Sequence, residues 1–230
     1  MTEGRGWEVQ VAAIVATAAM IGNQPPIGAW FPPIWTGADA ALVHRNGKGY
    51  FFRGDRYHRY DFERDFFDKV HAQIGGDGWQ GVWTSGINAA LVHPKNGKAY
   101  FFHGDRYQRF DFDKDRVDKE GVIGVDGWKG VWTTGIDAAL EHPKNGNIYF
   151  FRGNRYQRFS CDKDKVDKEG VIGVDGWKGV WTTDIDAALV HPRNCKAYFF
   201  RGGLYQRFNF DADPEGIDKD NARVGVDGWW

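Results

Sequence analysis

Two sets of potentially functional residues recur through the chain at one spacing. The first set contains the histidines His44, His93, His142 and His191. The second set contains the polar residues directly before each Ala-Ala-Leu tripeptide, namely Asp39, Asn88, Asp137 and Asp186. Within each set the residues stand 49 positions apart. Imidazoles are ligands for transition metals and haem iron, and carbonyl or carboxylate oxygens suit calcium or sodium, so both sets are candidate binding sites.

The residues that carry out catalysis in familiar enzyme motifs do not come together in this sequence. It contains no Gly-x-Ser-x-Gly, His-Glu-x-x-His, Walker or dinucleotide-binding pattern. The places that break the regular repetition are Asn88, Glu141, His58, Cys161, Cys195 and Gly203-Leu204. These residues do not group into an acid, a base and a nucleophile, so we expect a protein without enzymatic activity.

One copy of the repeat shows which elements position these residues. In the second copy, residues 89–92 form a short apolar run that ends at His-Pro-Lys-Asn-Gly, where Pro and Asn-Gly favour a chain reversal. Two aromatic-rich segments, 98–103 and 106–110, follow and are joined by Gly104-Asp105, which predicts a hairpin. Aromatic residues alternate between both faces of the first of these segments. A sheet with large apolar groups on both faces must be covered on both.

Four copies of this unit cover one another if they stand face to face around an axis. A repeat of this length without paired helical segments excludes a helical solenoid, and WD40 repeats are shorter. We therefore predict an all-β fold, a four-bladed β-propeller with short helices between the blades. The charged runs 111–121 and 161–170 would be solvated outer strands and short helices. The predicted divisions are an N-terminal extension at 1–27 and a propeller at 28–230, with blades at about 36–83, 84–132, 133–181 and 182–230.

The order of motifs within each copy resembles the hemopexin-like repeat. The pattern is Ile-Asp-Ala-Ala-Leu, a turn, Tyr-Phe-Phe-x-Gly-x-x-Tyr-x-Arg-Phe-Asp, a charged connection and a segment containing Trp. It recurs four times between about Gly28 and the C-terminus. This repeat builds the four-bladed propellers of hemopexin, of the C-terminal domains of matrix metalloproteinases, of legume seed albumins and of bacterial and fungal relatives. The resemblance implies a single propeller with a binding, interaction or storage function.

A propeller would bring the Ala-Ala-Leu strands together at its centre. If these strands are innermost, main-chain carbonyls at Asp39, Asn88, Asp137 and Asp186 face one axis and form a site for calcium or sodium. The resemblance implies the same site, because related propellers hold calcium through the main chain. It also implies a sodium or chloride ion deeper in the channel, near Ala41, Ala90, Ala139 and Ala188. Tight packing at a narrow centre explains these alanines equally well.

Small organic ligands are a further expectation for the channel mouth. Carboxylates of Asp39, Asp137 and Asp186 would attract a polyamine, and the resemblance to legume seed albumins implies spermine. The same carboxylates could instead cap the strand entry by bonding neighbouring amides.

The turn histidines raise the question of haem. His44, His93, His142 and His191 could bind haem or hemin, but propeller strands diverge from the axis, and hemopexin holds haem between two propellers. Haem binding therefore does not follow from the fold. The alternative to a small-ligand binder is a protein-interaction module or toxin, or a seed-storage-type protein without a dedicated ligand.

Composition restricts the remaining classes. Thirty basic residues balance 31 acidic ones, so neither nucleic acid nor an anionic membrane surface is an expected partner. The apolar stretch 9–22 is too short to span a bilayer and makes a poor signal peptide; a helix or strand packed on the propeller and an unstructured leader are the alternatives. Cys161 and Cys195 occupy non-equivalent places and are expected to be free thiols, which favours a cytoplasmic over a secreted location. The oligomeric state is expected to be a monomer or a homodimer.

Two tryptophans mark each junction between the repeats. They are spaced by four or five residues: Trp30 and Trp35, Trp79 and Trp83, Trp128 and Trp132, and Trp177 and Trp181, with Trp229 at the end of the last copy. We expect these pairs to be wedges between blades, since an aromatic side chain buries a large area. The alternative is an exposed aromatic platform for a ligand.

Overall fold

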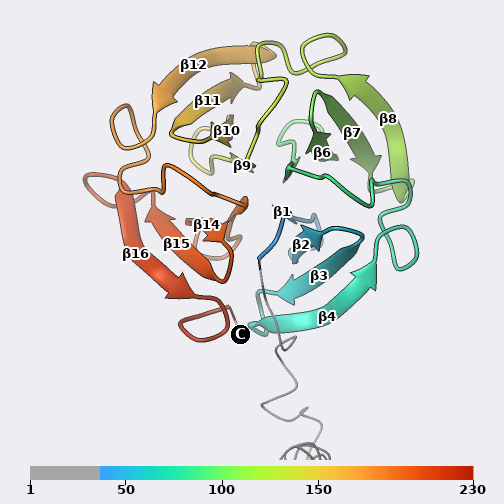
Figure 1. Cartoon of the computed structure of the whole chain (residues 1–230), viewed down its shortest axis with the longest axis horizontal. Helices are drawn as coiled ribbons and strands as arrows, with labels where there is room; N and C mark the ends of the chain where they lie inside the picture. The colour runs from blue at the N-terminus through green and yellow to red at the C-terminus, as the bar shows by residue number, and fades with distance from the viewer. Residues whose placement is uncertain (1–36, 230) are drawn as a thin grey trace, which may run out of the picture.

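The structure, a computed structural model, describes residues 37–229 as four antiparallel sheets of four strands each, arranged around one axis (Figure 1). Blade 1 contains β1 (Ala40–Val43), β2 (Gly49–Arg53), β3 (Arg56–Asp61) and β4 (Phe66–Gln73). Blade 2 contains β5 (Ala89–Val92), β6 (Ala99–His103), β7 (Arg106–Asp111) and β8 (Arg116–Val122). Blade 3 contains β9 (Ala138–Glu141), β10 (Ile148–Arg152), β11 (Arg155–Ser160) and β12 (Lys165–Val171). Blade 4 contains β13 (Ala187–Val190), β14 (Ala197–Arg201), β15 (Leu204–Asn209) and β16 (Gly216–Arg223). The predicted all-β, four-bladed propeller is confirmed.

The predicted reversals form at the turn residues identified in the sequence. In blade 2, β6 pairs with β5 on one side and with β7 on the other, and Phe102 lies opposite Tyr107. Asn96 holds the turn after β5. Its side-chain oxygen accepts a hydrogen bond from the Lys98 amide at 3.0 Å, and its side-chain nitrogen donates to the Tyr100 hydroxyl at 2.9 Å. Each sheet is therefore a meander of consecutive strands, running from the axis outward.

The charged runs form the outer strands. In blade 3, β12 pairs with β11, and Asp167 accepts a hydrogen bond from Arg158 Nε at 2.8 Å. The prediction of short helices between the blades is wrong, since residues 37–229 contain no α-helix. The chain turns directly after each outer strand, as at Gly124 and Gly127, whose φ values of +81° and +155° are incompatible with a helix.

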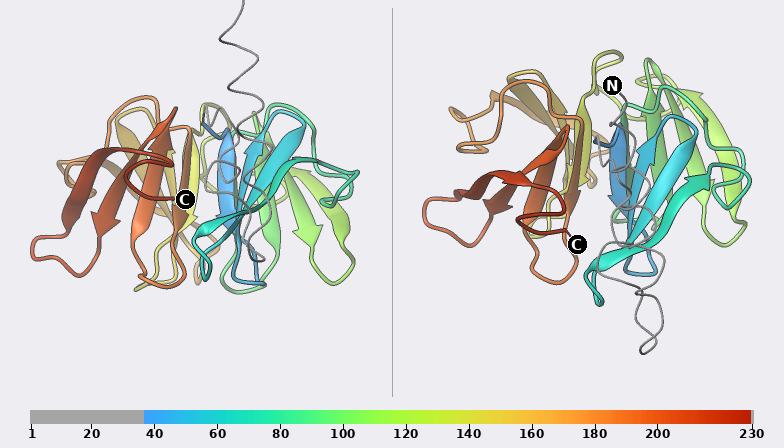
Figure 2. Two further views of the ribbon diagram at one scale, coloured as in Figure 1. Left: turned by 90° about the horizontal axis from the view of Figure 1, so that it is seen from below. Right: turned by 60° about the horizontal axis from the view of Figure 1, so that its bottom comes forward.

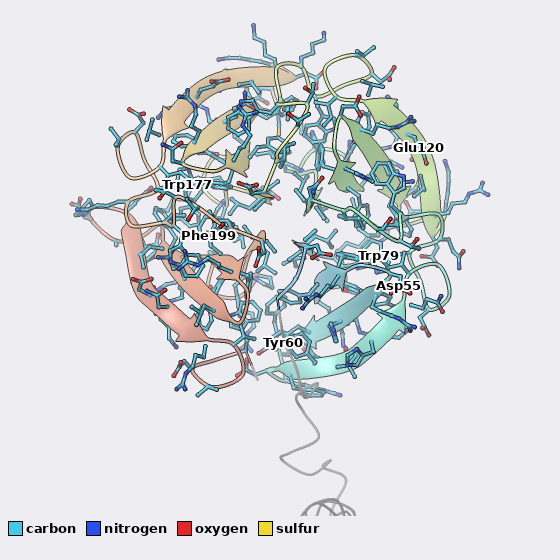
Figure 3. The ribbon with its side chains drawn as sticks, in the orientation of Figure 1. Asp55, Tyr60, Trp79, Glu120, Trp177 and Phe199 are labelled. Carbon is cyan, nitrogen blue, oxygen red and sulfur yellow. The ribbon has the colours of Figure 1, made fainter. Side chains whose placement is uncertain are left out.

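The hydrophobic core is divided among the four junctions between blades. Each core cluster combines residues of two neighbouring blades, and the cluster of blades 4 and 1 closes the ring. A buried tryptophan fills each junction: Trp79, Trp128, Trp177 and Trp229. Figure 3 labels Trp79 and Trp177. Trp229 lies between Tyr60 of blade 1 and Tyr198 of blade 4, with ring centroids 5.0 Å and 4.8 Å away. These four tryptophans are wedges, as the sequence predicts for the pairs.

The two cysteines differ in their surroundings. Cys161 is buried in the cluster between blades 2 and 3, at the place that Phe62, Phe112 and Phe210 fill at the other junctions. Cys195 is exposed in the turn between β13 and β14. Both are free thiols in the structure.

Side views show the four inner strands running along the axis and the outer strands inclined to it (Figure 2). The predicted N-terminal extension, residues 1–27, lies outside the described residues, as do Trp30 and Trp35. Within residues 37–229, no helix has the length and apolar character needed to cross a membrane.

Candidate functional site in the axial channel

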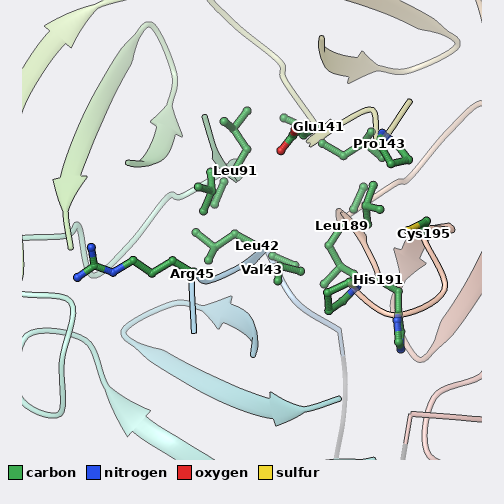
Figure 4. Close-up of a pocket in the computed structure, with 17 residues that line it drawn as sticks. Leu42, Val43, Arg45, Leu91, Glu141, Pro143, Leu189, His191 and Cys195 are labelled. Atoms are coloured by element: carbon green, nitrogen blue, oxygen red, sulfur yellow. The ribbon is translucent and has the colours of Figure 1, made fainter. Parts of the chain in front are cut away.

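The four inner strands, β1, β5, β9 and β13, surround a central channel. Each contacts the next, and β13 contacts β1, so the circle is closed. A cavity of about 310 Å³ lies between them (Figure 4). Two rings of equivalent residues line it: the alanines Ala41, Ala90, Ala139 and Ala188, and the leucines Leu42, Leu91, Leu140 and Leu189. The structure thus places the alanines of the predicted deeper ion site around one axis.

One carboxylate interrupts this apolar wall. The third ring of the cavity consists of Val43, Val92, Glu141 and Val190. The Glu141 side chain points into the cavity (Figure 4). Burial raises the pKa of Glu141, because the ionised carboxylate loses hydration among apolar neighbours. Glu141 is therefore suited to pair with a cation that enters the channel.

The turns after the inner strands form one mouth of the channel, and Arg45 and Cys195 lie there. Blade 2 holds the Arg45 guanidinium: Nη1 lies 2.5 Å from Asp113 Oδ1, and Nη2 donates to the Phe112 carbonyl at 3.0 Å. Cys195 takes the left-handed conformation, with φ of +54°, at a position that is glycine in the other three turns. Arg45 is thus held by blade 2, and no ion pair within residues 37–229 joins it to Glu141.

The polar residues before the inner strands mark the opposite mouth, where their side chains bond to the chain itself. Each side-chain oxygen accepts a hydrogen bond from a glycine amide in the following hairpin: Asp39 from Gly54 (2.9 Å), Asn88 from Gly104 (3.1 Å), Asp137 from Gly153 (2.6 Å) and Asp186 from Gly202 (2.6 Å). Burial raises the pKa of Asp137, against the lowering effect of the Gly153 amide. The side chains thus act as the capping alternative predicts, and a cation at this mouth would depend on main-chain carbonyls.

The four turn histidines lie at four separate junctions between blades. Each accepts a hydrogen bond at Nδ1 from the amide two residues later: His44 from Asn46 (2.9 Å), His93 from Lys95 (3.2 Å), His142 from Lys144 (3.2 Å) and His191 from Arg193 (3.1 Å). His44 also packs against Phe112 of the next blade, with 4.2 Å between the ring centroids. The structure does not bring these histidines together around one ligand.

Burial controls the protonation of these histidines. It lowers the pKa of His44, His142 and His191 to about 4, and it also lowers the pKa of His93. The neutral form, which can accept a hydrogen bond at Nδ1, therefore persists at neutral pH. Across residues 37–229, no three His, Cys, Asp or Glu side chains are grouped so that they could hold a metal ion.

Sequence reasoning identifies Glu141 as an exception among the copies but gives it no role. Comparison of the copies places Glu141 in a column with Val43, Val92 and Val190, which is a signal of a local difference in chemistry. Its meaning depends on the fact that the last residue of the inner strand lines the channel, which only the structure shows.

A closed ring of four sheets around an apolar channel defines the class of four-bladed β-propellers. A comparison with family models indicates which type of four-bladed propeller this is. The family model described as Hemopexin matches residues 136–173, which contain the four strands of blade 3. The chain therefore has the hemopexin fold, and the match to blade 3 agrees with the motif order of the repeat.

Solved structures of plant proteins share this fold. The hemopexin fold protein CP4 from cow pea is 23% identical, with a TM-score of 0.70 over 84% of this chain and 96% of that chain. A plant albumin from Cicer arietinum showing hemagglutination is 25% identical, with a TM-score of 0.67 over 78% of this chain and 90% of that one. A plant lectin with two metal binding sites from the same species is also 25% identical, with a TM-score of 0.65 over 79% and 92%. No curated protein matches the chain by sequence.

Proposed function

We propose that this propeller is a non-enzymatic binding protein whose axial channel takes a small organic cation, a polyamine such as spermine. The observation that carries the proposal is the position of Glu141, which places one carboxylate in a ring that is otherwise valine. A half-buried carboxylate without a cation is unfavourable, and an ammonium group beside it would balance its charge and supply a hydrogen-bond donor.

The shape of the channel supports an extended amine. A strand of four residues is about 13 Å long, which is comparable to a chain of several methylene groups. The alanine, leucine and valine rings would contact these methylenes, while Glu141 would pair with one ammonium group. Further ammonium groups would reach the solvent at the two mouths.

Inorganic cations belong to the same proposal. Calcium or sodium would lie at the mouth marked by Asp39, Asn88, Asp137 and Asp186, bound by main-chain carbonyls. The two metal binding sites named for the similar lectin from Cicer arietinum support a metal-binding propeller. Haem receives less support, because the four turn histidines are held apart and their Nδ1 atoms accept backbone hydrogen bonds.

Calorimetric titration of spermine at pH 7 and low salt tests the channel. We expect Glu141→Val to weaken binding at least about tenfold, because a charge-assisted hydrogen bond contributes about 1.5–3 kcal/mol. The double variant Val92→Glu with Glu141→Val moves the carboxylate to the equivalent place in blade 2, and it should restore binding to within about threefold. Equal affinity in the wild type and Glu141→Val would refute the role of this carboxylate.

A storage protein without a dedicated ligand is the second candidate. The seed albumins among the similar structures favour it. Absence of spermine binding and of a Soret shift with hemin would support this candidate over the first.

A further inference from the structure

Blade 2 contains a second cavity, of about 670 Å³, away from the axial channel. It lies between the segment before β5 and the hairpin of β6 and β7. Trp83 and Ser85 come from the first, His103 and Asp105 from the second, and Glu120 of β8 also lines it. Figure 3 labels Glu120 on the outer strand of this blade. Trp83 is the second tryptophan of its junction and is partly exposed, unlike the buried wedge Trp79.

In blades 3 and 4 the equivalent tryptophan is covered by an arginine of the same blade. The guanidinium carbon of Arg152 lies 4.2 Å from the ring centroid of Trp132, and that of Arg201 lies 4.2 Å from the centroid of Trp181. Arg152 Nη1 also donates to the carbonyl of Thr134 at 3.3 Å. Stacking on an indole and donation to a carbonyl are typical of guanidinium recognition.

In blade 2 this arginine is replaced by His103. The shorter imidazole stands perpendicular to the Trp83 ring, with 5.4 Å between the centroids. The His103 ring lies beside Gly86, as Arg152 lies beside Gly135 in blade 3, but an imidazole is shorter than an arginine side chain, and both His103 and Trp83 line the open cavity. Ser85 stands at the position of Thr134, whose carbonyl accepts the hydrogen bond from Arg152, and it lines the same cavity.

The support beneath the indole is the same in blade 2 as in blade 3. Gln108 is buried, and its side-chain oxygen accepts a hydrogen bond from the Trp83 amide at 3.0 Å. Its side-chain nitrogen donates to the Gly81 carbonyl at 3.0 Å and to Glu120 Oε1 at 2.7 Å. In blade 3, Gln157 makes the equivalent bond to the Trp132 amide at 3.1 Å. The tryptophan is thus held in the same way, and the difference is that an imidazole takes the place of the guanidinium against its ring.

The cavity of blade 2 is also more acidic than the equivalent places in blades 3 and 4. Asp105 stands where blades 3 and 4 have Asn154 and Gly203, so blade 2 gains an acidic group at the place where it lacks the arginine. Glu120 also lines the cavity, and Arg106 Nη2 lies 3.6 Å from its Oε2. An incoming cation would meet an aromatic face with carboxylates beside it.

We propose that this cavity binds a guanidinium group from outside the chain, either on an arginine side chain of a partner polypeptide or on a small guanidino compound. The group stacks on Trp83 and donates to the carboxylate of Asp105 and the carbonyl of Ser85. It thereby reproduces the arrangement that Arg152 and Arg201 make within the chain. This site is independent of the axial channel and of Glu141.

The test uses acetyl-Gly-Arg-Gly-amide, its lysine counterpart and agmatine, each titrated into the full chain and followed by the indole N–H signals in NMR. We expect the arginine peptide to shift the Trp83 signal, assigned with Trp83→Phe, with a Kd of about 1 mM. Binding at least fivefold tighter for the arginine peptide than for the lysine peptide supports the proposal. Agmatine binding as tightly as the peptide would identify a small guanidino compound as the source, and tighter peptide binding a polypeptide.

Matched variants use residues that the chain already carries in other blades. His103→Arg supplies the internal guanidinium of blades 3 and 4 and should reduce peptide binding at least tenfold, while leaving spermine binding unchanged. The pair Arg152→His with Asn154→Asp converts blade 3 to the chemistry of blade 2 and should add a second site, reported by the Trp132 signal. Unchanged binding in His103→Arg, equal binding of both peptides, or binding of simple sugars in place of the guanidinium probes would overturn the proposal.

Discussion

Glu141 shows how one residue can make a channel of nearly fourfold symmetry chemically asymmetric. Its neighbours in the ring are Val43, Val92 and Val190, so the blades alone would create an apolar pore. The charge is placed on one side of the axis and is buried enough for its pKa to rise. A ligand with one ammonium group therefore has one preferred direction of approach.

The unfavourable charge of Glu141 should make the stability of the protein depend on pH. The folded state raises the pKa of Glu141 above the unfolded value of 4.5, so ionisation opposes folding. The cost is absent below the unfolded pKa, grows as pH rises through the window up to the folded pKa, and is constant above it. Glu141→Val should thus be more stable than the wild type by about 1 kcal/mol at pH 7, with a smaller gain at pH 4.

Urea unfolding at both pH values measures this difference. Protonation of the buried histidines at low pH lowers the stability of both proteins equally, so this effect cancels in the comparison. Glu141→Gln is the control that keeps size and removes charge, and it should follow the same trend with pH. A gain that is independent of pH would contradict the assignment to ionisation.

At the scale of elements, the hairpins are fixed by residues that could equally have been metal ligands. Each of the four polar side chains accepts a hydrogen bond from a glycine amide in the next hairpin turn; the residues are Asp39, Asn88, Asp137 and Asp186. The strands and turns follow from apolar runs, Asn-Gly turns and aromatic alternation, which are local properties. The choice between cap and ligand was left open by the sequence, because an oxygen before a strand serves both purposes.

Removal of one cap should lower stability in a way that depends on the acceptor. Asp137→Ala leaves the Gly153 amide without its partner and should cost about 1 kcal/mol. Asp137→Asn keeps an oxygen, as Asn88 does in blade 2, and should lie within about 0.5 kcal/mol of the wild type. Chemical unfolding curves provide the measurement. Equal losses of stability in the two variants would show that the hydrogen bond from the Gly153 amide is not the cause.

The two tryptophans of a pair differ in their surroundings, and the interpretation of a ligand platform stays a prediction. In the pairs that the structure describes, the first tryptophan is a buried wedge, and the second packs against a histidine or an arginine of its own blade, as Trp132 does against Arg152. The wedges also take the left-handed conformation, with φ of +60° at Trp79. Spacing alone cannot separate these roles, because they depend on which side of the junction each ring enters.

At the scale of the whole molecule, the repeat explains what could be predicted. Four copies of nearly equal length with apolar residues on both sheet faces predict a closed ring, and a closed ring places the inner strands around an axis. The prediction of helices between the blades was wrong because glycines such as Gly124 and Gly127 turn the chain directly after the outer strands. The differences between blades, Glu141 and His103 among them, acquire meaning only from the surroundings that the closed ring creates.

Closure of the ring also determines how an axial cation would act on the fold. A cation held by one carbonyl from each inner strand would connect all four blades and would bind the folded state alone. Free calcium at 100 times its Kd would then add about 2.7 kcal/mol to the free energy of unfolding. For a domain of this size, melting should rise by about 5–10 °C relative to a sample with chelator.

The same experiment separates main-chain from side-chain binding. If carbonyls hold the cation, Asp137→Ala should melt lower than the wild type yet show the same rise with calcium. Loss of the rise in this variant would assign the ion to the carboxylate instead. No rise in either protein would count against calcium, and replacement of sodium by choline in the buffer would then test sodium, whose removal should lower the melting temperature if it occupies the axis.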